Sequence, residues 1–381
     1  MTAARAVLVR LRSVLLLPAG AIVLALIVGA VVMIASSPLV KGSLDPSLPL
    51  AAYWALLRGS VGSIDGIIDT LVRGTPLILV GLAVGLGFKA GLFNIGGQGQ
   101  FLVGAVSAAA VGGALHDATP IVAMSLALLA GTLAGLVYGF IPGFLKAFTG
   151  AHEVVTTIML NYVALYIVAY LITGPLRQPG ASFAQSRDVG FAALPEIIGA
   201  GTGHPGHLGI IVPFLAVPLI WWLLYRSTIG FEVRTVGANP DAALYAGMRP
   251  RRLIVLAMST AGLLAGLAGA LEILGVSRYM PAAYSTNVGF DAITVALLGR
   301  ANPIGILFGG LLLGAMRAGA PLMQGTGIPV QMVDLLQGII LFFLAAELLV
   351  RWVFRIREAK LGVDELQTVT RSYGGQTTTP S

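Results

Sequence analysis

The chain is organised around the run Gly91-Leu92-Phe93-Asn94-Ile95-Gly96-Gly97-Gln98-Gly99-Gln100-Phe101, which lies between two apolar stretches at residues 77–88 and 101–111. Four glycines within nine residues disfavour a continuous helix, and three amide side chains add polarity where hydrocarbon depth is expected. Such a segment is tolerated in a membrane only where protein buries it or water reaches it. Close helix packing also uses glycine but does not require three amides, so we expect this segment to line a pathway.

The composition is that of an integral membrane protein. Of the 381 residues, 57% are hydrophobic and 10% are charged, and the mean hydropathy is +0.91, whereas soluble domains carry about 25% charged residues. The chain has no cysteine, which excludes disulfides, thiolate metal sites and a cysteine nucleophile. Membrane orientation accounts for the net charge of +7, and no basic run with interleaved aromatic residues indicates nucleic-acid binding.

Long apolar runs predict an all-α polytopic fold. Arg5, Arg10 and Arg12 precede an apolar run over residues 14–35, which is too long for a signal peptide and predicts a first span with a cytoplasmic N-terminus. Later spans are expected at roughly 74–90, 100–115, 119–145, 153–174, 208–225, 252–275, 303–320 and 331–352. Three of these starts carry a capping residue before a proline, namely Thr75-Pro76, Thr119-Pro120 and Asn302-Pro303.

A tenth crossing is needed to balance the charges. Nine spans would leave the C-terminus outside, but basic residues cluster directly after the last span. Residues 288–298 are apolar but short, and counting them gives about ten crossings with both termini cytoplasmic and 16 of the 23 Lys and Arg residues inside. Residues 289–294 also bring an acid and a hydroxyl into an apolar setting. The two interrupted segments, one in each half of the chain, indicate a transport site near the membrane midplane.

Three regions are expected along the chain. An N-terminal span and an outer interfacial segment take residues 1–72, the transmembrane domain takes 73–352 with a cytoplasmic loop at 226–252, and a polar, disordered cytoplasmic tail takes 353–381. A long outer loop covers residues 175–207. His204 and His207 in that loop have no carboxylate within three residues, so we do not expect a metal site there.

The cytoplasmic loop carries the signals of a short helix. Asn239 is a good cap, Pro240 suits the first helical position, Asp241 suits the positive helix N-terminus, and Gly247 ends the helix. A two-turn helix is not stable alone in water, so it should dock on something. Neighbouring arginines allow docking on lipid headgroups, but the apolar residues 242–245 favour a protein partner.

The chain lacks the signatures of an enzyme. It contains no G-x-x-x-x-G-K-[ST], so we do not expect it to hydrolyse ATP, and it contains no H-E-x-x-H or G-x-S-x-G. We therefore expect a transport protein without a catalytic site, metal or cofactor.

Five motifs resemble those of the membrane-spanning permease subunits of bacterial ABC importers, in the nucleoside-like branch of the branched-chain amino acid and simple-sugar permease family. The motifs are GLFNIGGQGQF (91–101), HEVVTTIMLNYVA (152–164), GANPDAALYAGM (237–248), AGLLAGLAGALEILG (261–275) and GFDAITVALLGRANPIG (289–305). Together they cover most of residues 75–350. His152 stands where relatives usually carry asparagine.

The resemblance implies a nucleoside importer in the cell membrane, with two permeases, two ATPase subunits and an extracytoplasmic binding protein or lipoprotein. This chain would pair with a shorter, related permease, and the loop helix would be the coupling helix that fits a cleft of the ATPase. A simple sugar or a branched-chain amino acid is the alternative substrate. An ion-coupled secondary carrier is the alternative from another class, since it also uses broken helices and a buried acid.

Two sets of residues are candidates for these roles. The expected substrate-pathway residues are Phe93, Asn94, Gln98, Gln100, Asn161, Glu272, Asp291 and Thr294. The expected ATPase-coupling residues are Glu232, Arg234, Asn239, Pro240, Asp241, Leu244 and Tyr245. Asp291 is the strongest pathway candidate because an acid inside a membrane is functional by default. Glu272 could instead reach the outer interface, Asn161 could bond a neighbouring helix, and Phe93 could be a core aromatic. We expect Asn94, Gln98 and Asp291 to approach one another.

Overall fold

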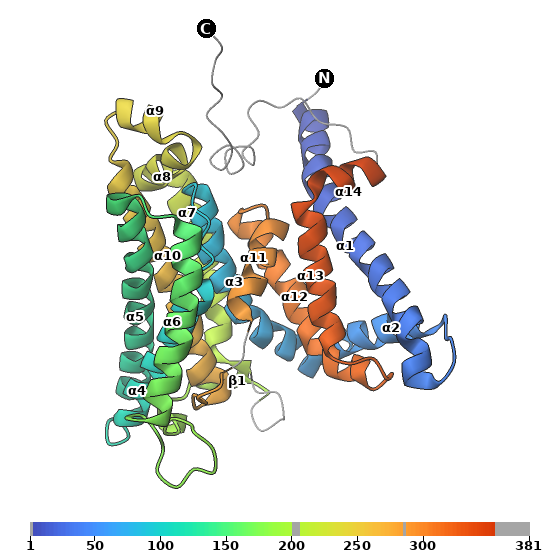
Figure 1. Cartoon of the computed structure of the whole chain (residues 1–381), viewed down its shortest axis with the longest axis horizontal. Coiled ribbons are helices and arrows are strands. Elements are labelled where there is room, and N and C mark those ends of the chain that lie inside the picture. The colour runs from blue at the N-terminus through green and yellow to red at the C-terminus, as the bar shows by residue number, and fades with distance from the viewer. Residues whose placement is uncertain (1–2, 200–205, 285–286, 355–381) are drawn as a thin grey trace.

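The computed structural model of the chain describes residues 3–199, 206–284 and 287–354. This part of the chain is almost entirely helical, as predicted, and has one small two-stranded sheet (Figure 1). The tail that was expected to be disordered lies outside the described residues from 355 onward. The helices are α1 (Ala3–Lys41), α2 (Leu48–Val61), α3 (Ile64–Lys89), α4 (Gly97–Ala114), α5 (Pro120–Thr149), α6 (Glu153–Thr173), α7 (Ile211–Arg226), α8 (Thr228–Ala238), α9 (Pro240–Tyr245), α10 (Pro250–Glu272), α11 (Val288–Leu298), α12 (Pro303–Gln324), α13 (Gln331–Ala345) and α14 (Glu347–Val353).

Seven helices in the described part of the chain are long and apolar enough to cross a membrane. They are the Leu16–Pro38 part of α1, α3, α5, α6, Leu208–Arg226, Pro250–Ser277 and α12. An eighth candidate is the pair of α13 and α14. The short helix α11 has the bounds predicted from the sequence, 288–298. These helices confirm a polytopic all-α protein.

Two predicted spans have the wrong shape. The span expected at 74–90 is part of α3, which begins at Ile64 and continues through Pro76. Ser63 caps α3 by accepting a hydrogen bond from the Gly66 backbone N–H at 3.0 Å. A proline within a membrane helix is tolerated where other groups satisfy the backbone carbonyl that loses its hydrogen bond. The boundary expected at residue 72, between the N-terminal region and the transmembrane domain, falls inside this helix. The span expected at 331–352 bends by 86° between α13 and α14.

The first two helices pack mainly on helices from the C-terminal part of the chain. The helix α1 packs on α13, and α2 packs on α12 and α3. One face of α2 buries Leu48, Ala52 and Leu56, while Leu50 and Trp54 are exposed. Apolar side chains thus lie on both faces of α2, and its role as the outer interfacial segment stays a prediction.

Close backbone contacts between glycines hold α4, α5 and α10 together. A methyl group on Gly104 of α4 would lie 2.4 Å from the Cα atom of Gly266 in α10. A methyl group on Gly135 of α5 would lie 2.5 Å from that same Cα atom. Small residues let helices approach closely in lipid, where packing rather than hydrophobic burial drives association. Some of the 50 glycines in the chain therefore serve this three-helix contact.

The two ends of the molecule differ. The start of α1, the helices α8 and α9, and α14 lie at one end (Figure 1). At the other end, the loop after α6 contains an antiparallel pair of strands, β1 (Glu196–Ile198) and β2 (Gly206–His207). The sequence analysis expected neither these strands nor α8. Ser227 caps α8 through the Gly230 backbone N–H at 3.0 Å.

Candidate functional site

The glycine-rich run at 91–101 contains the non-helical turn that separates α3 from α4. The side chain of Asn94 is fully buried, and its Oδ1 atom accepts a hydrogen bond from the Gly96 N–H at 3.0 Å. Its Nδ2 atom donates to Gln100 Oε1 at 3.2 Å. The two amides therefore pair with each other and with the irregular backbone, as a polar break inside a membrane requires.

Asn161 of α6 completes this arrangement from a neighbouring helix. Its Oδ1 atom accepts a hydrogen bond from the Gly99 N–H at 2.8 Å, and its Nδ2 atom donates to the Ile95 carbonyl at 3.0 Å. The structure thus shows the helix-bonding alternative for Asn161, and a role in the substrate pathway stays a prediction.

The two interrupted segments are in direct contact. The Gly289 N–H in the first turn of α11 donates to Gln98 Oε1 at 2.8 Å. A methyl group on Gly289 would lie 2.2 Å from the Gln98 backbone nitrogen. The segments from the two halves of the chain therefore meet backbone to backbone at Gln98 and Gly289. Gly289 lies two residues before Asp291.

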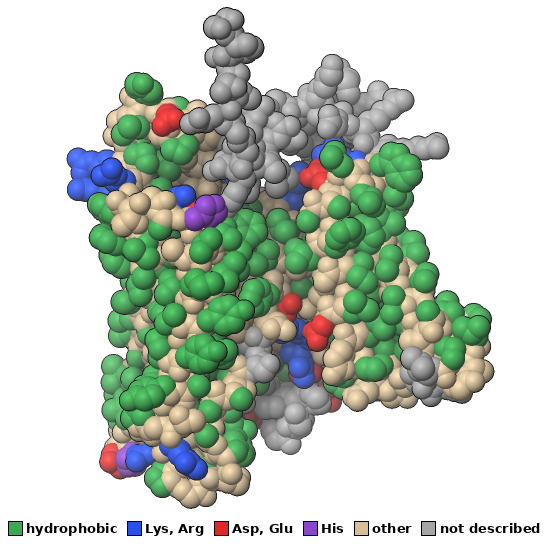
Figure 2. Space-filling model, viewed as in Figure 1, with side chains coloured by type: hydrophobic (Ala, Val, Ile, Leu, Met, Phe, Trp, Pro, Cys, Tyr) green, Lys and Arg blue, Asp and Glu red, His purple; other side chains and the backbone are tan. Residues whose placement is uncertain are grey.

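Asp291 belongs to a group of charged residues that we name the charged cluster. Its members come from α3, α10, α11, α12 and α13: Asp69, Arg73, Glu272, Asp291, Arg317 and Asp334. Asp291 forms an ion pair with Arg317, and Asp334 lies near enough to repel the Asp291 carboxylate. Figure 2 shows charged side chains in the hollow near the centre of the view.

Glu272 occupies the α10 corner of the charged cluster. Its Oε1 atom accepts a hydrogen bond from the Tyr284 hydroxyl at 3.3 Å, and Arg73 and Arg317 both lie within electrostatic range of its carboxylate. Arg73 also pairs with Asp69, with 3.0 Å between Nε and Oδ2. Burial raises the pKa of Tyr284 above its usual range and so keeps this donor protonated.

The sequence analysis missed Arg73, Tyr284, Arg317 and Asp334. Arg317 lies in an otherwise apolar run, and a basic residue inside a membrane segment is as much a functional signal as an acid. Applying that rule to basic residues as well as to acids finds Arg317. Arg73 and Asp334 lie near helix ends, where charge is ordinary, so only the tertiary structure reveals them.

Phe93 and Thr294 are less informative. The ring of Phe93 is partly buried, and its centroid lies 5.1 Å from that of Phe88. Thr294 is buried within α11. Both placements are compatible with packing, and their place in the pathway stays a prediction.

The helix α9 starts and ends where the sequence predicts. Asn239 Oδ1 accepts hydrogen bonds from the backbone N–H groups of Asp241 and Ala242, both at 3.0 Å. Pro240 is the first residue of α9, and Gly247 follows with the positive φ of 81° that ends such a helix. The side chain of Tyr245 is 94% exposed.

The other coupling candidates lie in α8. The guanidinium carbon of Arg234 lies 5.1 Å from the ring centroid of Tyr225 in α7, a cation–π contact. Glu232 is partly buried. Arg234 therefore attaches α8 to α7, and a contact of Arg234 or Glu232 with an ATPase stays a prediction.

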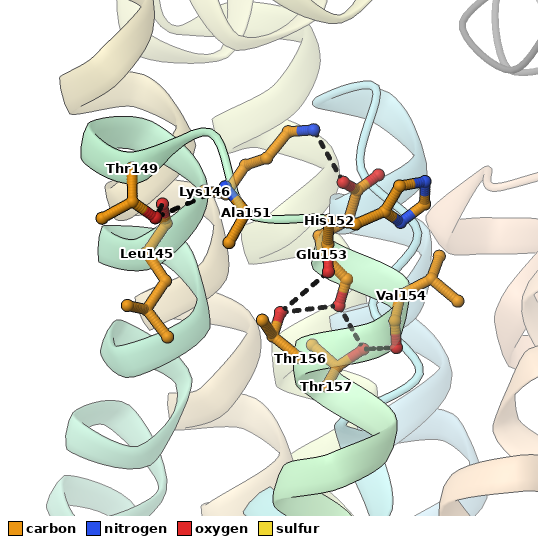
Figure 3. A network of polar contacts seen from close by, with 9 residues as sticks. All are labelled: Leu145, Lys146, Thr149, Ala151, His152, Glu153, Val154, Thr156 and Thr157. Atoms are coloured by element: carbon orange, nitrogen blue, oxygen red, sulfur yellow. Dashed lines mark hydrogen bonds and ion pairs between the residues drawn. The ribbon is translucent and has the colours of Figure 1, made fainter.

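A polar network joins the ends of α5 and α6. Lys146 Nζ lies 2.8 Å from Glu153 Oε2, and Thr157 Oγ1 donates to the Glu153 carbonyl at 2.7 Å (Figure 3). His152 precedes Glu153 as the N-cap residue and makes no side-chain cap hydrogen bond. Lys146 and Glu153 thus fix the connection between two spans.

Comparison with known proteins gives the chain a family. The family described as branched-chain amino acid transport system / permease component matches residues 66–345. The chain is 40% identical over 348 residues to the guanosine ABC transporter permease protein of Bacillus subtilis (strain 168), which covers 91% of this chain and 97% of that protein.

Two further relatives have related names. The nucleoside ABC transporter permease protein of Lactococcus lactis subsp. cremoris is 33% identical and covers 88% of this chain and 92% of its own length. The glucose ABC transporter permease protein of Haloferax volcanii is 34% identical and covers 78% of this chain and 80% of its own length. No solved structure matches the chain.

Proposed function

Because the chain belongs to the permease family of branched-chain amino acid transport systems, we propose that it forms the translocation pathway for nucleosides in an ATP-driven importer. It is a multi-pass protein of the cell membrane and an ABC permease subunit rather than an enzyme, with an ATPase and a substrate-binding protein as partners. Guanosine and nucleoside permeases are similar to it over most of its length, which supports nucleosides as the substrate.

The observation that carries the proposal is the design of α9. The helix is capped, is anchored by the buried Ala243, and exposes Tyr245 and Leu244. A six-residue helix in water needs a partner surface, and an ATPase cleft supplies one. A secondary carrier has no such requirement, so α9 favours the ABC importer.

The proposed topology has ten crossings with the N-terminus, α9 and the C-terminal tail in the cytoplasm. The eight candidate spans become ten when α4 and α11 are counted. The polar first turn of α4, with Gln98 and Gln100, lowers its apolarity, and α11 is short. A cysteine placed at Tyr245 should react only from inside cells, and one at Leu44 only from outside. The reverse pattern would reject this orientation.

The proposed pathway passes the contact of Gln98 with Gly289 and the charged cluster. Asn94, Gln100 and Asp291 lie next to this contact in sequence, and Phe93, Asn161, Glu272 and Thr294 are further lining candidates. A second, related permease would close the pathway, as the resemblance implies. The partly buried ion pair of Asp291 with Arg317 supports this placement because charges at membrane depth face protein or water.

Uptake by the reconstituted complex tests the proposal. The chain is co-expressed with its ATPase, partner permease and binding protein, and proteoliposomes are assayed with labelled guanosine. We expect guanosine uptake to require ATP. Unlabelled nucleosides should inhibit it more strongly than glucose, ribose or leucine does. Stronger inhibition by glucose would favour the sugar alternative, which the Haloferax relative supports. Uptake that needs an ion gradient but no ATP would favour a secondary carrier.

A further inference from the structure

The loop at 226–252 touches the glycine-broken segment at 91–101 through two glycines, Gly237 and Gly91. A methyl group on Gly237 of α8 would lie 2.3 Å from the Lys89 carbonyl oxygen and 2.7 Å from the Gly91 nitrogen. A methyl group on Gly91 would lie 2.9 Å from the Gly237 Cα atom. Gly91 also has a φ of 70°, which favours glycine. The two backbones are therefore in contact with no side chain between them.

An apolar cluster, separate from the main core, surrounds this contact. We name it the joint cluster, and it consists of Ala90, Leu92, Val233, Val236, Ala243, Leu253, Ala257 and Met258. Its members come from α8, α9, α10 and the turn after α3. The same small core thus anchors the exposed helix α9 and the start of the broken segment.

The turn after α3 is firmly held on its other side. The Leu92 N–H donates to the Gly87 carbonyl at 2.9 Å, and the Gly91 N–H donates to the Phe88 carbonyl at 3.1 Å. Asn94, which pairs with Gln100, follows Leu92 by two residues. Only Leu92 and Phe93 therefore separate the contact at Gly91 from Asn94 along the chain.

We infer that the contact of Gly91 with Gly237 is the joint through which movement of α9 reaches the glycine-broken segment, so that both are positioning residues for transport. This inference rests on the proposed function. Ala243 carries displacement from α9 to Val233 and Val236, and Gly237 passes it to the turn at 90–92. Close-packed interfaces shift between discrete arrangements instead of deforming smoothly, so a backbone-to-backbone contact passes a shift of α8 to the turn at 90–92.

The test separates ATP hydrolysis from transport in the reconstituted complex. Gly237→Ala adds a methyl group that pushes the turn and α8 apart but leaves Tyr245 and Leu244 unchanged. We expect the ATPase to co-purify and hydrolyse ATP, while substrate taken up per ATP falls about tenfold, within the range by which linking residues modulate coupling. The matched control is Gly338→Ala in α13, where the added methyl meets no atom within 4 Å.

A second pair of variants covers the case in which Gly237→Ala does not assemble. Leu92→Ala and Val236→Ala shrink the joint cluster without forcing the backbones apart, and both should lower uptake per ATP by about threefold. A wild-type ratio of substrate taken up per ATP in Gly237→Ala would overturn the inference. If Gly237→Ala does not assemble, a wild-type ratio in both Leu92→Ala and Val236→Ala would overturn it. Absence of ATP-dependent uptake in the wild type and in Gly338→Ala would instead reject the proposed function.

Discussion

Arg317 of α12 and Asp291 of α11 form an ion pair whose side chains are only 22% and 16% exposed, respectively. The pair ties the short helix α11, which touches Gln98 through Gly289, to a full-length helix. Desolvated pairs of this kind are costly to break from one side because one charge is then left uncompensated. The ion pair therefore fixes the position of α11.

Neutralising one partner should destabilise the protein more than neutralising both. Arg317→Gln and Asp291→Asn should each cost about 3 kcal/mol and lower the melting temperature of the purified protein, whereas the double variant should recover part of the loss. The measurement is a thermal unfolding series with the exposed Arg58→Gln as control. A loss in the double variant equal to the sum of the two single losses would show that the two charges do not interact.

Replacing Asn161 should lower the stability of the protein, because its side chain bonds the backbone of the glycine-broken segment. Asn161→Leu leaves the Gly99 N–H and the Ile95 carbonyl without their partner, at about 1–3 kcal/mol for each buried group. The neighbouring Tyr162, 57% exposed, gives the control Tyr162→Leu, which should leave the melting temperature unchanged. If Asn161→Leu melts normally but loses uptake, the residue contacts substrate instead.

Glycine contacts between α4, α5 and α10 should tolerate no added methyl group. In Gly266→Ala the new Cβ atom would lie 2.6 Å from the Gly131 carbonyl oxygen and 2.7 Å from the Gly135 Cα atom, and neither backbone atom can rotate away. Overpacking of this kind costs about 1–3 kcal/mol or more. Gly338→Ala should instead be neutral or stabilising by about 0.5 kcal/mol. Monodisperse yield in gel filtration and melting temperature are the readouts, and equal yields of the two variants would contradict the prediction.

The parts of the fold with local causes could be predicted from the sequence. Asn239 with Pro240 and Asn302 with Pro303 start their helices as expected, because a cap and a proline act within one turn. The bounds of α11 were also correct. Thr75 with Pro76 failed as a helix start because Ser63 caps α3 earlier and the Thr75 hydroxyl bonds the Leu71 carbonyl within the helix.

The parts of the site with long-range causes could not be predicted. The bond from Gly289 to Gln98 joins residues 191 positions apart, and nothing near either residue signals it. The same holds for the contact of Gly91 with Gly237, in which no side chain takes part. The sequence singled out the two polar segments that contact each other in the structure, because glycine and amides at membrane depth are unusual. It could not say that Asn94, Gln100 and Asn161 would satisfy one another.

His207 should make stability depend on pH. Burial lowers its pKa to about 4, and its ring nitrogens have no hydrogen-bond partner among the described residues. Below about pH 6.5 the unfolded chain binds a proton at this residue that the folded chain does not. Stability should fall by up to about 3 kcal/mol as pH drops from 6.5 to 4 and should not change from this cause above 6.5. His207→Leu should flatten the dependence, whereas His116→Leu at an exposed site should not; equal slopes in the wild type and His207→Leu would contradict this.

A charge on α9 should detach the ATPase. Tyr245 is the most exposed apolar contact of the helix, so Tyr245→Asp should leave the fold of the isolated permease intact while placing a carboxylate in the desolvated partner cleft. Burying an unpaired carboxylate costs several kcal/mol, which weakens docking by about a hundredfold or more. Asn239→Ala should be milder, at about 1 kcal/mol through the lost cap.

Co-purification of the ATPase, ATP hydrolysis and uptake are the three measurements that decide whether α9 is the docking helix. The control is Leu44→Asp, which adds the same charge to an exposed apolar residue at the opposite end of the molecule and should change none of them. Asn239→Ala should retain the ATPase but bind it less tightly, since only the helix start is loosened. Normal co-purification and uptake in Tyr245→Asp would mean that α9 rests on lipid headgroups, and the structural argument against a secondary carrier would then be lost.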